Sequence, residues 1–220
     1  MATNEPGLRE LKKQITREAI ADAARQLALG NGLDHVTLDE IAHVAFVSPR
    51  TVSNYFSCKE EAIVAAGARD VLTIATELAQ RPVTEAPMQS LRLLLVDFAS
   101  SRTGRQLRVG AQTIGLAQLY ESLRPFHTAH YDTLEEALRD AVAQRTSTDV
   151  DEDMYPRLVA GAAVSAYKSA MRLWARIGAP PELLPQLIGI AFDQISDACD
   201  SSRWTREPSA FSLNAVVAAV

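Results

Sequence analysis

The sequence has 220 residues, of which 47% are hydrophobic and 22% are charged, and its net charge is −5. This length and composition are those of a globular chain with one or two buried cores. The acidic balance excludes a protein that coats nucleic acid regardless of sequence, so any DNA contact must use a local group of cations. The two cysteines, Cys58 and Cys199, lie far apart and no secretory signal is evident, which predicts a cytoplasmic protein without disulfides.

Residues 10–29 carry apolar side chains at three- and four-residue intervals, which is the spacing of one helix face. Gly30 and Gly32 follow this stretch. Glycine commonly ends a helix because it adopts a positive φ without a side-chain clash. A first helix ending near these glycines is therefore predicted.

Three hydroxyl residues, Thr37, Ser48 and Ser57, then stand where helices can begin, because each can accept a hydrogen bond from a first-turn N–H. Thr37 and Ser57 are each followed three residues later by a glutamate, the pattern of a capping box, and Ser48 is followed by Pro49. Only residues 45–47 separate the first two helices, so these must cross steeply. The pattern predicts a helix-turn-helix followed by the start of another helix.

The helix beginning after Ser48 presents an outward face with one cation and no carboxylate. Its side chains can donate hydrogen bonds to phosphates or to base edges, as a recognition helix in a major groove requires. The outward residues are Arg50, Thr51, Ser53, Asn54 and Tyr55.

The segment from Thr16 to Glu60 resembles the DNA-binding domain of tetracycline-repressor (TetR) family regulators. The positions that carry this resemblance are Thr16, Arg17, Ile20, Ala23, Ala24, Leu27, Gly32, Thr37, Ile41, Ala42, Val47, Ser48, Thr51, Tyr55, Phe56, Lys59 and Glu60. The resemblance implies that Arg50 and Asn54 read base edges and that Pro49 and Ser53 make close contacts in the groove. The residues that it places at phosphates are Thr37, Ser48, Thr51, Tyr55 and Lys59, with Arg17 as a weaker candidate.

One residue of the turn departs from the family pattern, because Phe46 stands where the family usually has glycine. A phenylalanine held at positive φ would cost about 1–2 kcal/mol. The alternative is a turn of different geometry, and the sequence leaves both open.

The rest of the chain reads as further helices with no strand-like alternation. They are expected at residues 57–81, 91–98, 105–119, 125–145, 154–177 and 181–198, with a polar loop at 146–153. This is an all-α chain of about nine helices, with a helix-turn-helix DNA-binding domain at residues 1–60 and a ligand-binding and dimerisation domain at residues 61–220. The apolar stretch 211–220 is too short to span a membrane, so no membrane contact is expected, and its packing is left open.

The last two helices are strongly apolar, and residues 160–166 are rich in small side chains that allow helices to approach closely. A homodimer with a four-helix interface, as in TetR proteins, is expected from these helices. The alternative is that both belong to the core of one chain.

Polar and aromatic residues on the middle and late helices are candidates to line an apolar effector pocket. They are Phe98, Arg102, Tyr120, Phe126, His127, Tyr131, Tyr167, Met171 and Trp174. The Leu123–Pro125 and Leu173–Trp174 segments are similar to actinobacterial TetR proteins that accept acyl-CoA or other lipid-like molecules. His127 and His130 could share a metal, but without further ligands no metal site and no cofactor are expected.

The sequence thus predicts a DNA-binding transcriptional regulator that is not an enzyme, most simply a repressor released from its operator by a small hydrophobic effector. An activator and a ligand-independent repressor need the same DNA contacts, so they stay open. A different class, an all-α enzyme or small-molecule carrier with structural N-terminal helices, is the alternative.

Overall fold

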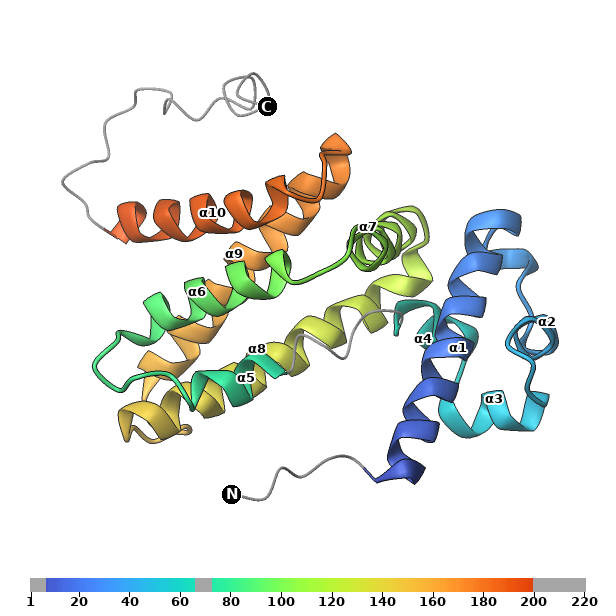
Figure 1. The fold of residues 1–220 in the computed structure, drawn as a ribbon, viewed down its shortest axis with the longest axis horizontal. Helices are drawn as coiled ribbons and strands as arrows, with labels where there is room; N and C mark the ends of the chain where they lie inside the picture. Colours follow the sequence, from blue (N-terminus) through green and yellow to red (C-terminus); the bar gives the residue numbers. More distant parts are fainter. Residues whose placement is uncertain (1–6, 66–72, 200–220) are drawn as a thin grey trace.

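The computed structural model describes residues 7–65 and 73–199, and within these ranges all of the regular structure is helical (Figure 1). The α-helices are α1 (Leu8–Asn31), α2 (Leu38–Val44), α3 (Pro49–Tyr55), α4 (Lys59–Val64), α5 (Thr73–Leu78), α6 (Pro87–Ser100), α7 (Gly104–Leu119), α8 (Arg124–Thr146), α9 (Met154–Ile177) and α10 (Leu183–Cys199). Two 3₁₀ turns, η1 (Leu33–His35) and η3 (Glu121–Leu123), precede α2 and α8. The predicted all-α fold is confirmed.

Most helix boundaries lie within a few residues of those predicted, and α9 begins and ends at the predicted residues. The stretch expected as one helix over residues 57–81 is described in two parts, α4 and α5. Residues 66–72 between them lie outside the described residues, as does the apolar stretch 211–220. No helix of the described part is long and apolar enough to cross a membrane.

The start of α4 corrects one prediction, because Cys58 and not Ser57 is its N-cap residue. The Cys58 sulfur accepts from the Glu61 backbone N–H at 3.5 Å. The Glu61 carboxylate in return accepts from the backbone N–H and the hydroxyl of Ser57, at 2.8 and 2.7 Å. The capping arrangement is therefore shifted by one residue. Glu60 and Glu61 are consecutive, so the three-residue spacing fits a cap at Ser57 and also a cap at Cys58.

Two hydrophobic clusters organise the described residues. The N-terminal cluster is formed mainly by residues of α1 to α4, such as Ile20, Ile41 and Val52, and also includes side chains of α7 and η3. The C-terminal cluster gathers residues of α5 to α10 around side chains such as Leu134 and Leu138. In Figure 1 the first four helices lie at one end of the molecule, where α7 and one end of α8 reach them.

Helix α7 belongs to both clusters. Leu107 and Ile114 pack in the C-terminal cluster, whereas Leu116 and Ala117 pack in the N-terminal cluster. Since buried side chains resist independent movement, α7 is a mechanical connection between the two ends of the molecule.

The turn between α2 and α3 settles the question of Phe46. This residue adopts a left-handed conformation with φ of 55°. The N–H of Val47 donates to the carbonyl of Ala42 at 3.0 Å, and the N–H of Phe46 donates to that of His43 at 3.3 Å. These two bonds are those of a Schellman helix end, in which the left-handed residue is usually glycine. The phenyl ring gains little burial in return, because Phe46 is 95% exposed.

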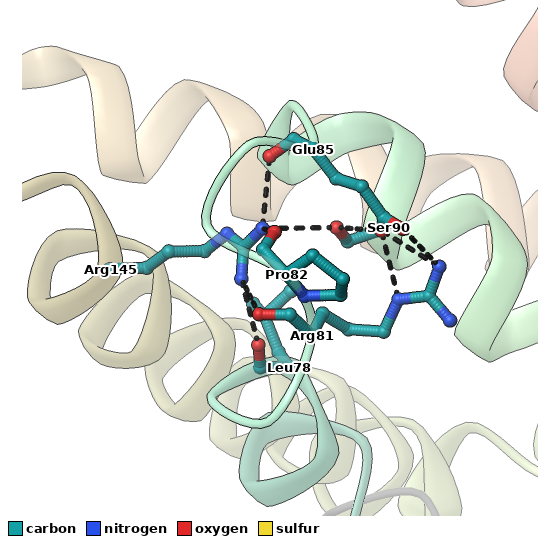
Figure 2. A network of polar contacts seen from close by, with 6 residues as sticks. All are labelled: Leu78, Arg81, Pro82, Glu85, Ser90 and Arg145. Atoms are coloured by element: carbon teal, nitrogen blue, oxygen red, sulfur yellow. Dashed lines mark hydrogen bonds and ion pairs between the residues drawn. The ribbon is translucent and has the colours of Figure 1, made fainter.

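A single arginine of α8 holds the segment between α5 and α6 (Figure 2). The Arg145 guanidinium donates to the carbonyls of Arg81 and Glu85 at 2.8 and 2.9 Å, and also to the carbonyls of Leu78 and Pro82. Arg81 pairs with the Glu85 carboxylate at 2.7 Å. This hydrogen bond is the main cause that lowers the Glu85 pKa. The end of α5 is thereby tied to α8.

Candidate DNA-binding surface and effector site

Helix α3 is held in place by its buried face and by its first residue. Val52 is fully buried, and Phe56, directly after the helix, is 2% exposed. Ser48 caps the helix by accepting from the N–H of Thr51 at 3.0 Å. The predicted caps at Thr37 and Ser48 are both confirmed.

The opposite face of α3 is open to solvent. Pro49, Arg50, Ser53 and Asn54 are all exposed, and α3 carries no acidic residue. The Ser53 hydroxyl donates to the Pro49 carbonyl at 3.2 Å. Arg50 and Asn54 are thus free of the core and lie one turn apart, so both side chains can reach one groove.

The residues expected to contact phosphates lie beside this face, and they differ in their exposure to solvent. Thr37 and Ser48 are exposed at the starts of α2 and α3, whereas Thr51 and Tyr55 are half-buried. The Thr37 hydroxyl donates to the Glu40 carboxylate at 2.9 Å, and the Ser48 and Thr51 hydroxyls lie 2.8 Å apart. Helix starts with exposed hydroxyl groups are common phosphate contacts.

Two of the predicted phosphate-binding cations have contacts within the chain. The Lys59 ammonium donates to the carbonyls of Leu33 and Val36 at 2.9 and 3.0 Å. The Arg17 guanidinium donates to the Tyr55 carbonyl at 3.0 Å and lies 4.2 Å above the Phe56 ring. Both cations therefore brace the helices around α3, and the sequence pattern did not reveal this structural part of their role.

The candidate effector residues divide between the two clusters. Tyr131, Tyr167, Met171 and Trp174 belong to the C-terminal cluster and are each less than a tenth exposed. Phe98 packs against the same cluster. An effector held by these side chains would be enclosed by protein.

Polar groups accompany this aromatic set. The Arg102 guanidinium lies 4.2 Å from the centre of the Phe98 ring. Burial raises the pKa of the Tyr167 hydroxyl, while the positive charge of Arg102 opposes the shift. The Trp174 indole donates to the Pro180 carbonyl at 3.0 Å, so its polar edge is used to fix the turn into α10.

His127 packs edge-on against Tyr131, with ring centres 5.1 Å apart. Its side chain is buried, and burial lowers the pKa of His127 to about 4. The positive charges of His130, Arg172 and Lys168 contribute to the same shift. His127 is consequently neutral at physiological pH. Across the residues that the structure describes, no three potential ligands gather into a metal site.

Tyr120 and Phe126 lie elsewhere, because both pack against the N-terminal cluster. The Tyr120 hydroxyl lies beside Gly32, where an added Cβ would be only 3.2 Å away. The structure therefore does not bring all nine predicted effector residues together. These two instead connect the segment around η3 to the helix-turn-helix.

The fold and the exposed helix define a helix-turn-helix regulator joined to a larger helical region. Two family models match the chain, one described as bacterial regulatory proteins of the tetR family over residues 20–66 and one as the MftR C-terminal domain over residues 85–200. The HTH-type transcriptional regulator TcmR of Streptomyces glaucescens is 30% identical over 205 residues, which cover 89% of this chain and 87% of TcmR. The chain belongs to the TetR family of transcriptional regulators.

Solved structures have the same fold. A TetR regulator from Nitrosomonas europaea has a TM-score of 0.54 at 16% identity, over 82% of this chain and 97% of that one. Thermus thermophilus FadR, a TetR family repressor in complex with lauroyl-CoA, has a TM-score of 0.51 at 22% identity, over 89% of this chain and 99% of that one.

Proposed function

We propose that this regulator is a repressor that binds its operator as a homodimer and is released by a small hydrophobic effector. The exposed, acid-free face of α3 carries the proposal, because it presents Arg50 and Asn54 one turn apart beside capped helix starts. The helix-turn-helix domain is residues 1–60 and the effector and dimerisation domain is residues 61–220. Since a regulator works where the DNA is, the protein acts in the cytoplasm.

In this proposal Arg50 and Asn54 read base edges, while Pro49 and Ser53 lie close to the groove. Thr37, Ser48, Thr51 and Tyr55 contact phosphates, and Lys59 and Arg17 add positive charge. Arg17 also ties α1 to the end of α3, and Lys59 ties α4 to the segment around η1. Two copies place one α3 each in successive major grooves, about 34 Å apart or a multiple of this.

Binding to DNA from the upstream region of its own gene, measured by fluorescence anisotropy, tests this. Arg50→Ala should weaken specific binding by about 1–3 kcal/mol and relax the preference at one base position. Arg139→Ala, which removes an arginine of α8 far along the chain from α3, is the matched control and should leave binding unchanged. Equal losses for Arg50→Ala on specific and random DNA would remove Arg50 from base readout.

The proposed dimer uses the outer face of α9. Met154, Leu158, Ser165 and Ser169 are exposed at helical spacing, with the half-buried Ala162 among them. Large apolar side chains at one end and small ones along the rest suit a two-fold contact between close helices. The inner members of the small-residue run, such as Ala160 and Ala163, are fully buried within the chain itself.

Light scattering coupled to size exclusion tests the dimer. Leu158→Glu should yield monomers with native helix content, since Leu158 is 63% exposed within one chain. Leu119→Glu changes a residue of α7 that is 72% exposed and should leave the dimer intact. Dimers that persist in Leu158→Glu would place the interface elsewhere.

The effector is proposed to bind among Phe98, Arg102, His127, Tyr131, Tyr167, Met171 and Trp174, with Tyr120 and Phe126 at the border to the N-terminal cluster. A buried aromatic cluster beside an arginine suits an acyl chain that ends in an anionic group, and FadR of Thermus thermophilus was solved with lauroyl-CoA. Lauroyl-CoA should release the DNA, and Phe98→Ala should reduce this response without changing DNA affinity. Leu119→Ala is the control, and no release by lauroyl-CoA would refute the acyl-CoA-like effector.

A further inference from the structure

An open pocket of about 470 Å³ lies between the second half of α1 and the first half of α7. It is lined by Arg25 and Leu29 of α1 and by Arg105, Arg108, Val109 and Gln112 of α7, among others. We propose that this pocket binds a small organic anion that carries phosphate or carboxylate groups. The inference goes beyond the proposed function, because the site is separate from both the α3 surface and the effector residues of the C-terminal cluster.

Arg25 is the most informative residue of this pocket, because it is only 5% exposed. Its guanidinium donates to the Gln112 side chain and to the Asp22 carboxylate, the latter at 3.1 Å. Its Nε has no hydrogen-bond partner among the described atoms. This Nε is closed off from solvent, so the buried guanidinium keeps a positive charge that its two partners do not fully compensate.

The charge around the pocket is unbalanced. Its charged lining residues are three arginines, Arg25, Arg105 and Arg108. One carboxylate, that of Asp22, pairs with Arg25 at 3.1 Å and with Arg105 at 3.8 Å. Two positive charges therefore remain in excess, which attracts an anion carrying more than one negative charge.

The start of α7 adds to this imbalance. Arg105 lies in the first turn of α7 and Arg108 in the second, and the first turn contains no acidic residue. The positive end of the helix dipole disfavours cations at this position. A bound anion would relieve the repulsion, whereas Thr103 already caps the helix by accepting from the Gln106 N–H.

The volume of the pocket and two apolar side chains in its mainly polar lining favour an organic ligand over a bare ion. Leu29 and Val109 face the pocket from its two sides, and a volume of about 470 Å³ lies within the usual range of small-molecule sites. The anionic group of such a ligand would bind the arginines, and the carbon skeleton of the ligand would cover Leu29 and Val109.

The position also separates the pocket from the proposed DNA surface. Arg17, which contacts the last residue of α3, precedes Arg25 by eight residues, or about 12 Å of helix rise. The ligand would instead join α1 of the N-terminal cluster to α7, reinforcing the hydrogen bond between Arg25 and Gln112. Through this junction it would alter DNA affinity, a step that rests on the proposed function.

Calorimetric titration of the full chain without DNA tests the site independently of operator binding. The probes are phenyl phosphate, inorganic phosphate and citrate. We expect saturable binding, with phenyl phosphate tighter than inorganic phosphate because its ring meets Leu29 and Val109. Citrate distinguishes a carboxylate-selective from a phosphate-selective site.

Arg105→Gln and Arg108→Gln should each weaken binding about ten-fold, since a charge-assisted hydrogen bond is lost. Both residues are exposed, so both variants should fold. Asp22→Asn, which removes the competing carboxylate, should tighten binding several-fold. Arg124→Gln, an exposed arginine outside the pocket, is the matched control. Lack of saturable binding of all three probes, or equal affinities in all variants, would overturn the proposal.

Discussion

The turn of the helix-turn-helix stores conformational strain that a single substitution should release. Phe46 has a φ of 55° and is 95% exposed. The left-handed conformation costs an L-residue about 1–2 kcal/mol, whereas glycine adopts it freely. Phe46→Gly therefore removes the strain with almost no loss of buried surface.

The gain is reduced because glycine has more freedom in the unfolded chain, a cost of about 0.4–1 kcal/mol. The net expectation is a stabilisation of about 1 kcal/mol, or a rise in Tm of about 2–4 °C for a chain of this size. Urea unfolding followed by circular dichroism, together with a thermal scan at one protein concentration, would measure it.

Phe46→Ala is the decisive control, because it removes the same ring but keeps the Cβ that clashes at positive φ. It should change the free energy of unfolding very little. Phe46→Asn should fall between the two, since asparagine tolerates this conformation better than most residues. Equal stabilities of the glycine and alanine variants would refute the strain, and a glycine variant less stable than alanine would show that the turn needs its restricted backbone.

Three further outcomes are expected. Lys59→Ala should destabilise the fold by about 1–3 kcal/mol, because two carbonyls lose a charged donor. If Lys59 also contacts a phosphate, the slope of log DNA affinity against log salt concentration should fall by about one. An unchanged slope would leave Lys59 only its structural role. Arg145→Met should lower the free energy of unfolding in urea by about 2–4 kcal/mol. Arg139→Met on the same helix should lower it far less. Equal effects would contradict the stabilising role of the polar contacts in Figure 2. His127 stays neutral in the folded state down to a pKa of about 4. From pH 6.5 to 4 the unfolded state therefore takes up the proton first, and His127 lowers stability by up to about 1.4 kcal/mol per pH unit. Burial also lowers the pKa of His130, so His127→Gln should reduce this slope and not abolish it, and the same slope in both proteins would show that His127 is not its source.

Local patterns in the sequence predicted much of the fold. The caps at Thr37 and Ser48 are confirmed because they depend on residues three apart. The cap at Ser57 was wrong by one residue, because Ser57 and Cys58 each precede a glutamate by three positions. Spacing alone could not choose between these two frames.

Contacts between distant segments could not be predicted in this way. Nothing around Lys59 indicates that its ammonium reaches the carbonyls of Leu33 and Val36. Tyr120, directly after α7, and Phe126, near the start of α8, were expected among the effector residues, yet both pack against the N-terminal cluster. The way in which helices dock decides such contacts, and periodicity reports only which face of a helix is apolar.

The docking of α7 gives a physical route from ligand to DNA. Its Leu107 and Ile114 pack with the helices that carry the proposed effector residues, and its Leu116 and Ala117 pack with the helices that hold α3. An effector among α8 and α9 and an anion between α1 and α7 would therefore both act on the placement of this one helix. Because coupling between binding sites is reciprocal, an anion that weakens operator binding must itself bind more weakly to the DNA complex by the same factor. An operator affinity that the anion leaves unchanged would mean that the site between α1 and α7 is not coupled to α3.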